Sequence, residues 1–193
     1  MIDHLAGKVD SITPTYAVID CNGVGYITHI SLNTYTKIKD VSTIKILTHL
    51  AIREDAHVLY GFADEHEREL FRQLISVSGI GAATARMILS SLNPVEIEKA
   101  IATGDLLTLK KIKGIGAKSA ERIIVDLKDK VGKGGYTSAE LTGVSGGNQE
   151  ALMALVALGF PKLAVEKVLL RVRQEHGTDL KVEEIIKYAL KYL

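Results

Sequence analysis

Residues 74–92 read LISVSGIGAATARMILSSL, and the same pattern recurs without gaps as LKKIKGIGAKSAERIIVDL at residues 109–127. The two copies are identical at eight of nineteen positions, and both contain Gly-Ile-Gly-Ala. Apolar residues at helical spacing lie on both sides of each Gly-Ile-Gly, which is itself a turn signal. The duplication therefore predicts two helical hairpins that share one conformation.

Each predicted turn contains two glycines, Gly79 and Gly81 in the first copy and Gly114 and Gly116 in the second. Glycine permits positive φ and close approach by another group. A helix that starts at such a turn also presents unpaired backbone N–H groups to anions. A single turn could equally serve only to join two packed helices. Two copies beside basic residues favour a tandem helix-hairpin-helix motif that grips DNA phosphates independently of base sequence.

Charge is distributed unevenly around the two turns. The net charge is only +1, yet residues 109–128 hold six Lys and Arg against two acidic residues, whereas residues 1–73 hold seven against ten. A local basic patch of this kind is typical of phosphate binding. The side chains expected to contact DNA beside the four glycines are Thr84, Arg86, Lys113, Lys118 and Arg122.

The regions around the duplication predict an α+β protein of several domains. Residues 1–62 contain five short β-rich runs, which are typical of a five-stranded antiparallel β-barrel of the OB type. Residues 63–131 predict an all-α tandem hairpin domain, and residues 148–193 predict a three-helix bundle. Residues 132–147 carry six glycines and no hydrophobic period, so they predict a flexible linker. The five runs are residues 2–9, 16–21, 23–32, 43–52 and 57–62.

Composition and motifs argue against several functions. The single cysteine excludes an internal disulfide, and the six histidines lack zinc-ligand spacing, so no metal or cofactor is expected. Gly-Ala-Lys-Ser at residues 116–119 lacks the glycines of a phosphate-binding ATPase loop, and Gly79-x-Gly81 follows a predicted helix instead of a strand. No apolar run approaches the roughly 18 residues of a membrane span. The N-terminus has no signal-peptide layout, so we expect a cytoplasmic protein.

The order of these regions resembles the RuvA family over the whole chain, and residues 53–56 (Arg-Glu-Asp-Ala) and 59–62 (Leu-Tyr-Gly-Phe) match the signature of that family. The resemblance implies a non-catalytic subunit that recognises four-way Holliday junctions and holds them open. It would recruit the RuvB ATPase for branch migration in homologous recombination, DNA repair and the SOS response. The implied assembly is a homotetramer, or two tetramers stacked face to face, with the RuvC resolvase as a further partner.

The resemblance also implies roles for particular residues. Glu54 and Asp55 would form an acidic pin near the fourfold axis of the tetramer, where their negative field repels phosphates; the alternative is an exposed acidic turn. The C-terminal helices would form a bundle like the ubiquitin-associated domain and bind RuvB, although plain core packing is the alternative for each candidate side chain. These partner-binding candidates are Leu155, Leu158, Phe160 and Leu190.

The sequence departs from the family pattern after the first turn. Members of the family often carry a lysine there, whereas this chain has Ala82-Ala83-Thr84. The first hairpin is therefore expected to rely on backbone N–H groups, on the Thr84 hydroxyl and on Arg86.

Two other classes of protein fit the sequence less well. A helix-hairpin-helix glycosylase needs a catalytic Asp or Lys at a fixed distance after the hairpin, and a nuclease needs clustered carboxylates for metal ions. Glu54 and Asp55 are adjacent, so on a strand they would point to opposite faces. An adaptor that stacks single-stranded bases would need more aromatic residues than three Phe and no Trp. Metal-dependent cleavage of junction DNA by the chain alone would identify an enzyme.

Overall fold

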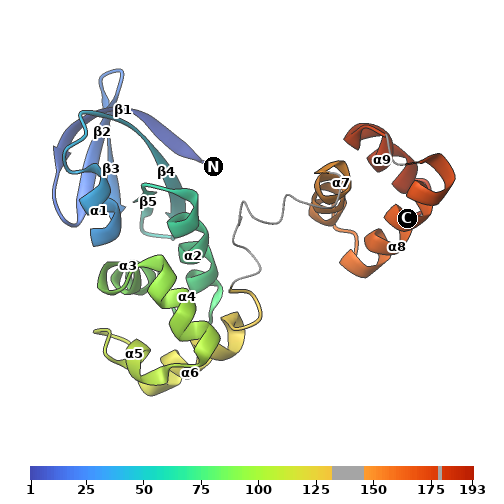
Figure 1. The fold of residues 1–193 in the computed structure, drawn as a ribbon. Helices are drawn as coiled ribbons and strands as arrows, with labels where there is room; N and C mark the ends of the chain where they lie inside the picture. Colours follow the sequence, from blue (N-terminus) through green and yellow to red (C-terminus); the bar gives the residue numbers. More distant parts are fainter. Residues whose placement is uncertain (132–145, 178–179) are drawn as a thin grey trace. The chain divides into compact units, whose positions relative to one another are not determined.

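The computed structural model describes residues 1–131, 146–177 and 180–193. The chain divides into two compact units, Met1–Gly135 and Tyr136–Leu193, which are not placed relative to one another (Figure 1). Most of the predicted glycine-rich linker, residues 132–145, lies outside the described residues.

The N-terminal strands form a closed five-stranded barrel, which confirms the predicted barrel. Antiparallel pairs join all neighbours except β3 and β5, which run parallel. The expectation of a fully antiparallel barrel was therefore wrong. An odd number of strands in a closed ring cannot alternate in direction throughout, so one neighbouring pair has to be parallel. The strands are β1 (His4–Ile12), β2 (Tyr16–Cys21), β3 (Val24–Ile30), β4 (Thr43–Ile52) and β5 (His57–Phe62), in the ring order β1-β2-β3-β5-β4.

A short helix, α1 (Leu32–Ile38), lies between β3 and β4 and was not predicted. The third strand was expected to continue to Leu32, but it ends at Ile30. Ser31 caps the helix because its Oγ accepts a hydrogen bond from Thr34 N at 3.0 Å. α1 carries the chain from the parallel edge of β3 to the start of β4.

Five helices follow the barrel within residues 63–131, in agreement with the all-α region predicted there. Asp64 caps the first of them by accepting from Glu67 N at 2.9 Å. Asn93 and Glu96 form a reciprocal capping box at the start of α4, and Gly104 ends that helix at φ +72°. The helices are α2 (Glu65–Ser76), α3 (Ala82–Ser91), α4 (Pro94–Thr103), α5 (Leu106–Lys110) and α6 (Ala117–Leu127).

The barrel and these helices share apolar packing within one compact unit. Phe71 of α2 is fully buried. The centroid of its ring lies 5.1 Å from the ring centroid of Tyr60 and 4.9 Å from that of Phe62. Both partners belong to β5, and they join the buried helical residues in a single cluster. The last barrel strand is therefore also part of the core of the hairpin region. In Figure 1, α2 runs directly from the barrel toward α4 and α6.

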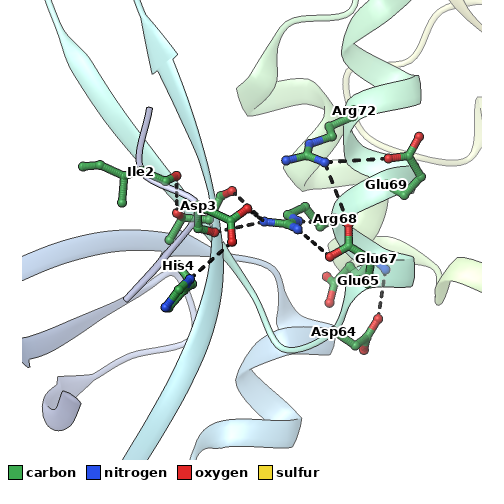
Figure 2. A network of polar contacts seen from close by, with 10 residues as sticks. Ile2, Asp3, His4, Asp64, Glu65, Glu67, Arg68, Glu69 and Arg72 are labelled. Carbon is green, nitrogen blue, oxygen red and sulfur yellow. Dashed lines mark hydrogen bonds and ion pairs between the residues drawn. The ribbon is translucent and has the colours of Figure 1, made fainter. Parts of the chain in front are cut away.

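Two consecutive charged residues of α2 bond to different parts of the N-terminal region: Arg68 bonds to Asp3, just before β1, and Glu67 bonds to the start of α1. Arg68 Nη1 donates to the Asp3 carbonyl at 2.9 Å and to Asp3 Oδ1 at 2.7 Å, as Figure 2 shows. Glu67 accepts from Ser31 Oγ, and it accepts from Thr34 Oγ1 at 2.8 Å. Burial raises the pKa of Glu67, although these two hydroxyl donors oppose the shift. The carboxylate and the guanidinium thus orient the whole helical region against the barrel.

Three helices lie in the described part of the C-terminal unit, residues 146–177 and 180–193, as predicted. They are α7 (Gly146–Ala157), α8 (Lys162–His176) and α9 (Val182–Ala189). Their buried residues meet in one cluster, which includes Ala151, Val165, Leu169, Val172 and Ile185.

Candidate nucleic-acid interface

The first glycine turn connects α2 to α3 through two short hydrogen-bonded steps. Val77 N donates to the Leu74 carbonyl at 3.2 Å, and Ile80 N donates to the Val77 carbonyl at 3.0 Å. Gly79 has φ +89°, a conformation that side-chain-bearing residues rarely adopt. Ile80 is buried in the core, so the isoleucine anchors the turn while the glycines on either side stay exposed.

The second turn repeats this geometry between α5 and α6. Ile112 N donates to the Leu109 carbonyl at 3.2 Å, and Ile115 N donates to the Ile112 carbonyl at 3.1 Å. Gly114 has φ +88°, and Ile115 is buried like its counterpart. The prediction of two hairpins with a shared conformation is therefore confirmed at the level of the backbone.

The second glycine of each turn is not required by the fold. Gly81 and Gly116 have φ of −84° and −82°, values that any residue can adopt. A Cβ built on either one meets no atom within 4 Å in the described part of the chain. Each is the N-cap of a helix and supplies no side-chain cap within the described residues. The first backbone N–H groups of α3 and α6 are thus open to an external acceptor that approaches closely, which suits a phosphate oxygen.

Basic side chains surround the second turn. Lys113 and Lys118 are exposed on either side of Gly114 and Gly116. Arg122 is also exposed, but its Nη1 donates to the Ser78 carbonyl at 3.2 Å. Because Ser78 belongs to the first turn, Arg122 links the two hairpins while its side chain stays near their surface.

The first turn lacks such a flank. Ala83 is exposed at the position equivalent to Lys118, and Thr84 is half-buried. Arg86, the one basic residue of α3, donates from Nη1 to the Thr15 carbonyl of the barrel at 2.9 Å. The structure therefore brings both turns together but directs Arg86 toward the barrel instead of an approaching phosphate.

The acidic pair lies where the polar interruption between two apolar runs indicated. Arg53 N donates to the Ala56 carbonyl at 2.9 Å and closes the turn between β4 and β5. Glu54 and Asp55 occupy the exposed tip of this hairpin. Two carboxylates at an exposed tip can repel phosphates, and their role as a pin stays a prediction.

The four partner-binding candidates of the C-terminal unit are not equivalent. Leu155 is completely buried, so it packs in the bundle core and offers no surface; for this residue the core-packing alternative holds. Phe160 is half-buried and packs against the same core. Leu158 and Leu190 are 63% and 46% exposed. Only these last two present large apolar surfaces to a partner.

Sequence reasoning missed the polar residues that orient the site. Glu67 precedes the buried residues Leu70, Phe71 and Leu74 by three, four and seven positions, so helical spacing does place it on the buried face. That spacing was the available signal. Asn33 had no such signal, because its Nδ2 donates to the Leu89 and Leu92 carbonyls of α3, far along the chain.

Within residues 1–131, 146–177 and 180–193, no group of three or more His, Cys, Asp and Glu side chains is arranged to hold a metal ion. No helix among the described residues is long and apolar enough to cross a membrane.

A closed barrel joined to two open glycine turns, the second of them beside basic residues, defines the class as a tandem helix-hairpin-helix protein. Family models match along the chain in this order: "RuvA N terminal domain" at residues 1–61, "SAM-like Helix-hairpin-helix tandem" at residues 71–129 and "RuvA, C-terminal domain" at residues 147–193.

Full-length relatives agree with the family models. The chain is 48% identical over 202 residues to the Holliday junction branch migration complex subunit RuvA of Bacteroides fragilis. It is 49% identical over 194 residues to the protein of that name from Christiangramia forsetii and 49% identical over 196 residues to that of Flavobacterium psychrophilum. Each alignment covers 100% of both chains. The chain belongs to the RuvA family.

Proposed function

We propose that this protein is the junction-binding subunit of a branch migration complex, which recognises four-way Holliday junctions and holds them open. The observation that carries the proposal is the pair of open turns, in which Gly81 and Gly116 leave helix N-termini free for phosphates. Relatives that align over the full length are named as subunits of such a complex. Binding through phosphates makes recognition independent of base sequence and strongly dependent on salt.

The first experiment compares a synthetic four-way junction with a linear duplex of equal length in a gel-shift titration. Preference for the junction, unchanged by base sequence and weakened steeply by salt, is the expected result. Strong dependence on a consensus sequence would contradict the proposal. Mass measurement of the complex in the same solution tests the proposed homotetramer and distinguishes one tetramer from two stacked face to face.

The protein itself is proposed to be non-catalytic, with the ATPase activity in RuvB and strand cleavage in the RuvC resolvase. The absence of an ATPase loop in the sequence supports this division. Incubation of the purified chain with junction DNA and Mg²⁺ should give no cleavage, and incubation with ATP should give no hydrolysis. The setting for this activity is DNA recombination and repair in the cytoplasm.

The C-terminal helices are proposed to bind RuvB, and the exposed Leu158 and Leu190 support a contact surface there. Deletion of residues 132–193 should preserve junction binding and abolish migration driven by RuvB. The double variant Leu158→Ser with Leu190→Ser should reproduce the deletion without shortening the chain. A truncated chain that still stimulates RuvB would refute this assignment.

The exposed Glu54 and Asp55 are proposed to form an acidic pin that adds specificity, because one pair per subunit would place eight carboxylates around the junction centre. Glu54→Gln with Asp55→Asn should bind linear duplex more tightly and keep junction binding. It should also change the rate of migration. Unchanged duplex affinity and migration at low salt, where surface charges act most strongly, would reduce the pair to a solvated turn.

A further inference from the structure

The first hairpin is attached to the barrel by a side chain that was expected to contact DNA. Arg86 Nη1 donates to the Thr15 carbonyl at 2.9 Å, and the same atom lies 3.3 Å from His29 Nδ1. A guanidinium only donates hydrogen bonds, so His29 accepts as a neutral imidazole. Burial and, secondarily, the charge of Arg86 lower the pKa of His29, which keeps the ring in that neutral form.

The barrel side of this contact is held firmly. The Thr15 carbonyl also accepts from Ile30 N at 3.1 Å, and Thr13 N donates to the Tyr16 carbonyl at 2.8 Å. Tyr16 pairs with His29 across β2 and β3, and His29 pairs with Tyr60 across β3 and β5. Arg86 therefore bonds to the barrel where a closed turn adjoins three paired strands. Because the strand pairing fixes the position of this turn, a shift of α3 would break the hydrogen bond.

The C-terminal half of the same helix makes further contacts with α1. Asn33 Nδ2 donates to the Leu92 carbonyl at 3.0 Å, and Leu32 N donates to Ser90 Oγ at 3.2 Å. These contacts lie at the end of α3 that is distant from Gly81. Arg86 is the polar link to the barrel nearest to the open turn, since it stands in the second turn of α3.

From this placement we infer that Arg86 is a positioning residue, which acts through Thr15 and His29 to fix the first glycine turn relative to the barrel. The inference deepens the proposed function and rests on it. In the proposed homotetramer, the barrels of several subunits would set the positions of their hairpins. Each arm of a junction would then have to reach glycine turns whose positions are fixed relative to the other arms. A linear duplex can shift along one pair of hairpins. Loss of the anchor therefore lowers affinity for a junction more than affinity for a duplex.

The test measures junction and duplex affinity of the full chain against salt concentration for Arg86→Met, Arg86→Lys and Lys118→Ala. Arg86→Met should lower junction affinity about three- to tenfold, the fold-change that corresponds to the net contribution of one ordinary hydrogen bond. Its salt slope should stay unchanged. Lys118→Ala should lower the slope by about one unit, as expected for a phosphate contact. Arg86→Lys keeps one donor and should restore part of the loss.

A double-mutant cycle with His29→Gln identifies the route of the effect. If Arg86 acts through the barrel, the two single changes are not additive, whereas a phosphate ligand would give additive losses. Ser91→Ala on the same helix is the neutral control, because Ser91 is exposed and bonds only to the Met87 carbonyl. Thermal melting of each variant separates loss of positioning from loss of folding: a fall in junction affinity matched by an equal fall in duplex affinity and a lower melting temperature overturns the inference.

The remaining outcomes are distinguishable. A salt slope reduced by about one unit in Arg86→Met would make Arg86 a phosphate ligand and overturn the inference. So would unchanged affinity for both DNAs. Gly116→Thr tests the proposed function independently: if that variant binds junctions normally, the hairpins are structural and the proposed function fails with them. If Gly116→Thr loses binding while Arg86→Met does not, only the positioning role fails.

Discussion

The two hairpins have the same backbone but use their side chains differently. Gly79 and Gly114 have φ values of +89° and +88°, and the turns close with equivalent hydrogen bonds. After the turn, however, the first copy carries Ala83 and directs Arg86 to the barrel, whereas the second carries the exposed Lys118. Both copies therefore have a backbone suited to binding an anion, whereas the side chains attach the first copy to the barrel and give the second a basic surface.

The largest effect should follow from placing a side chain on Gly81 or Gly116, the second glycine of each turn. Gly81→Thr and Gly116→Thr add a Cβ where no atom lies within 4 Å in the described structure, and threonine is a good N-cap. The helices should keep their stability, but the side chain blocks the N–H groups and competes for them. Each change should lower junction affinity roughly ten- to a hundredfold, the equivalent of one hydrogen bond to a charged group.

Gel-shift titration and thermal melting of the same samples check this prediction. Equal losses in the two variants would support equal use of both turns by the DNA. A loss confined to Gly116→Thr would break the comparison, because the first hairpin would then serve only as an attachment.

A smaller effect should follow from exchanging the side chains after the turns. Ala83→Lys gives the first hairpin the cation that the second has at Lys118, and both positions are exposed. The slope of log affinity against log salt is negative. We expect it to become steeper by about one unit in Ala83→Lys and shallower by about one unit in Lys118→Ala. The double variant should return to the original slope. Fluorescence anisotropy titrations at several salt concentrations measure these slopes.

The smallest effect concerns pH and should involve the first hairpin alone. The pKa of His29 is lowered by burial and by Arg86, so the unfolded chain binds a proton at that site more readily than the folded chain. Stability contributed by neutral His29 is present above the unfolded value near 6.5 and is lost as pH falls through the lower folded value. His29→Gln should lose less stability on acidification from pH 7 to 5.

Thermal melts of the two proteins at each pH give this difference directly. The pKa of His49 is also lowered, by burial first and then by Arg72 and Arg68. His49 is common to both proteins, so the comparison cancels its contribution. An identical pH profile in His29→Gln would mean that folding does not lower the pKa of His29.

The barrel could be predicted from the sequence only in part. The β-rich runs located all five strands, and alternation in a run such as Ile44 and Ile46 indicates which face is buried. It carries no information on the direction of the neighbour, so the parallel pair of β3 and β5 was missed. α1 was missed because seven residues hold too few turns for a helical period, and only the Ser31 cap marks its start.

The site shows the same division between local and distant information. The glycine turns followed from the duplication, because a turn depends on the residues within it. The direction of Arg86 did not follow, since its acceptor at Thr15 is 71 residues away in sequence. The orientation of Leu155 was ambiguous for a related reason: an apolar residue on a short helix fits a core or a binding surface equally well until its neighbours are known.

The shared packing of β5 and α2 affects the order in which the protein folds while it is being synthesised. The ribosome delivers the chain from its N-terminus at about 5 to 20 residues per second. β1, β2 and β3 are consecutive neighbours and can pair as they emerge. The rings of Tyr60 and Phe62, however, lack their contact with Phe71 until that residue has emerged from the ribosome. Asp3 likewise lacks its hydrogen bonds from Arg68. The nascent barrel therefore exposes aromatic surface until α2 has left the exit tunnel, so translation of residues 65–76 completes a domain that the strands alone leave unfinished.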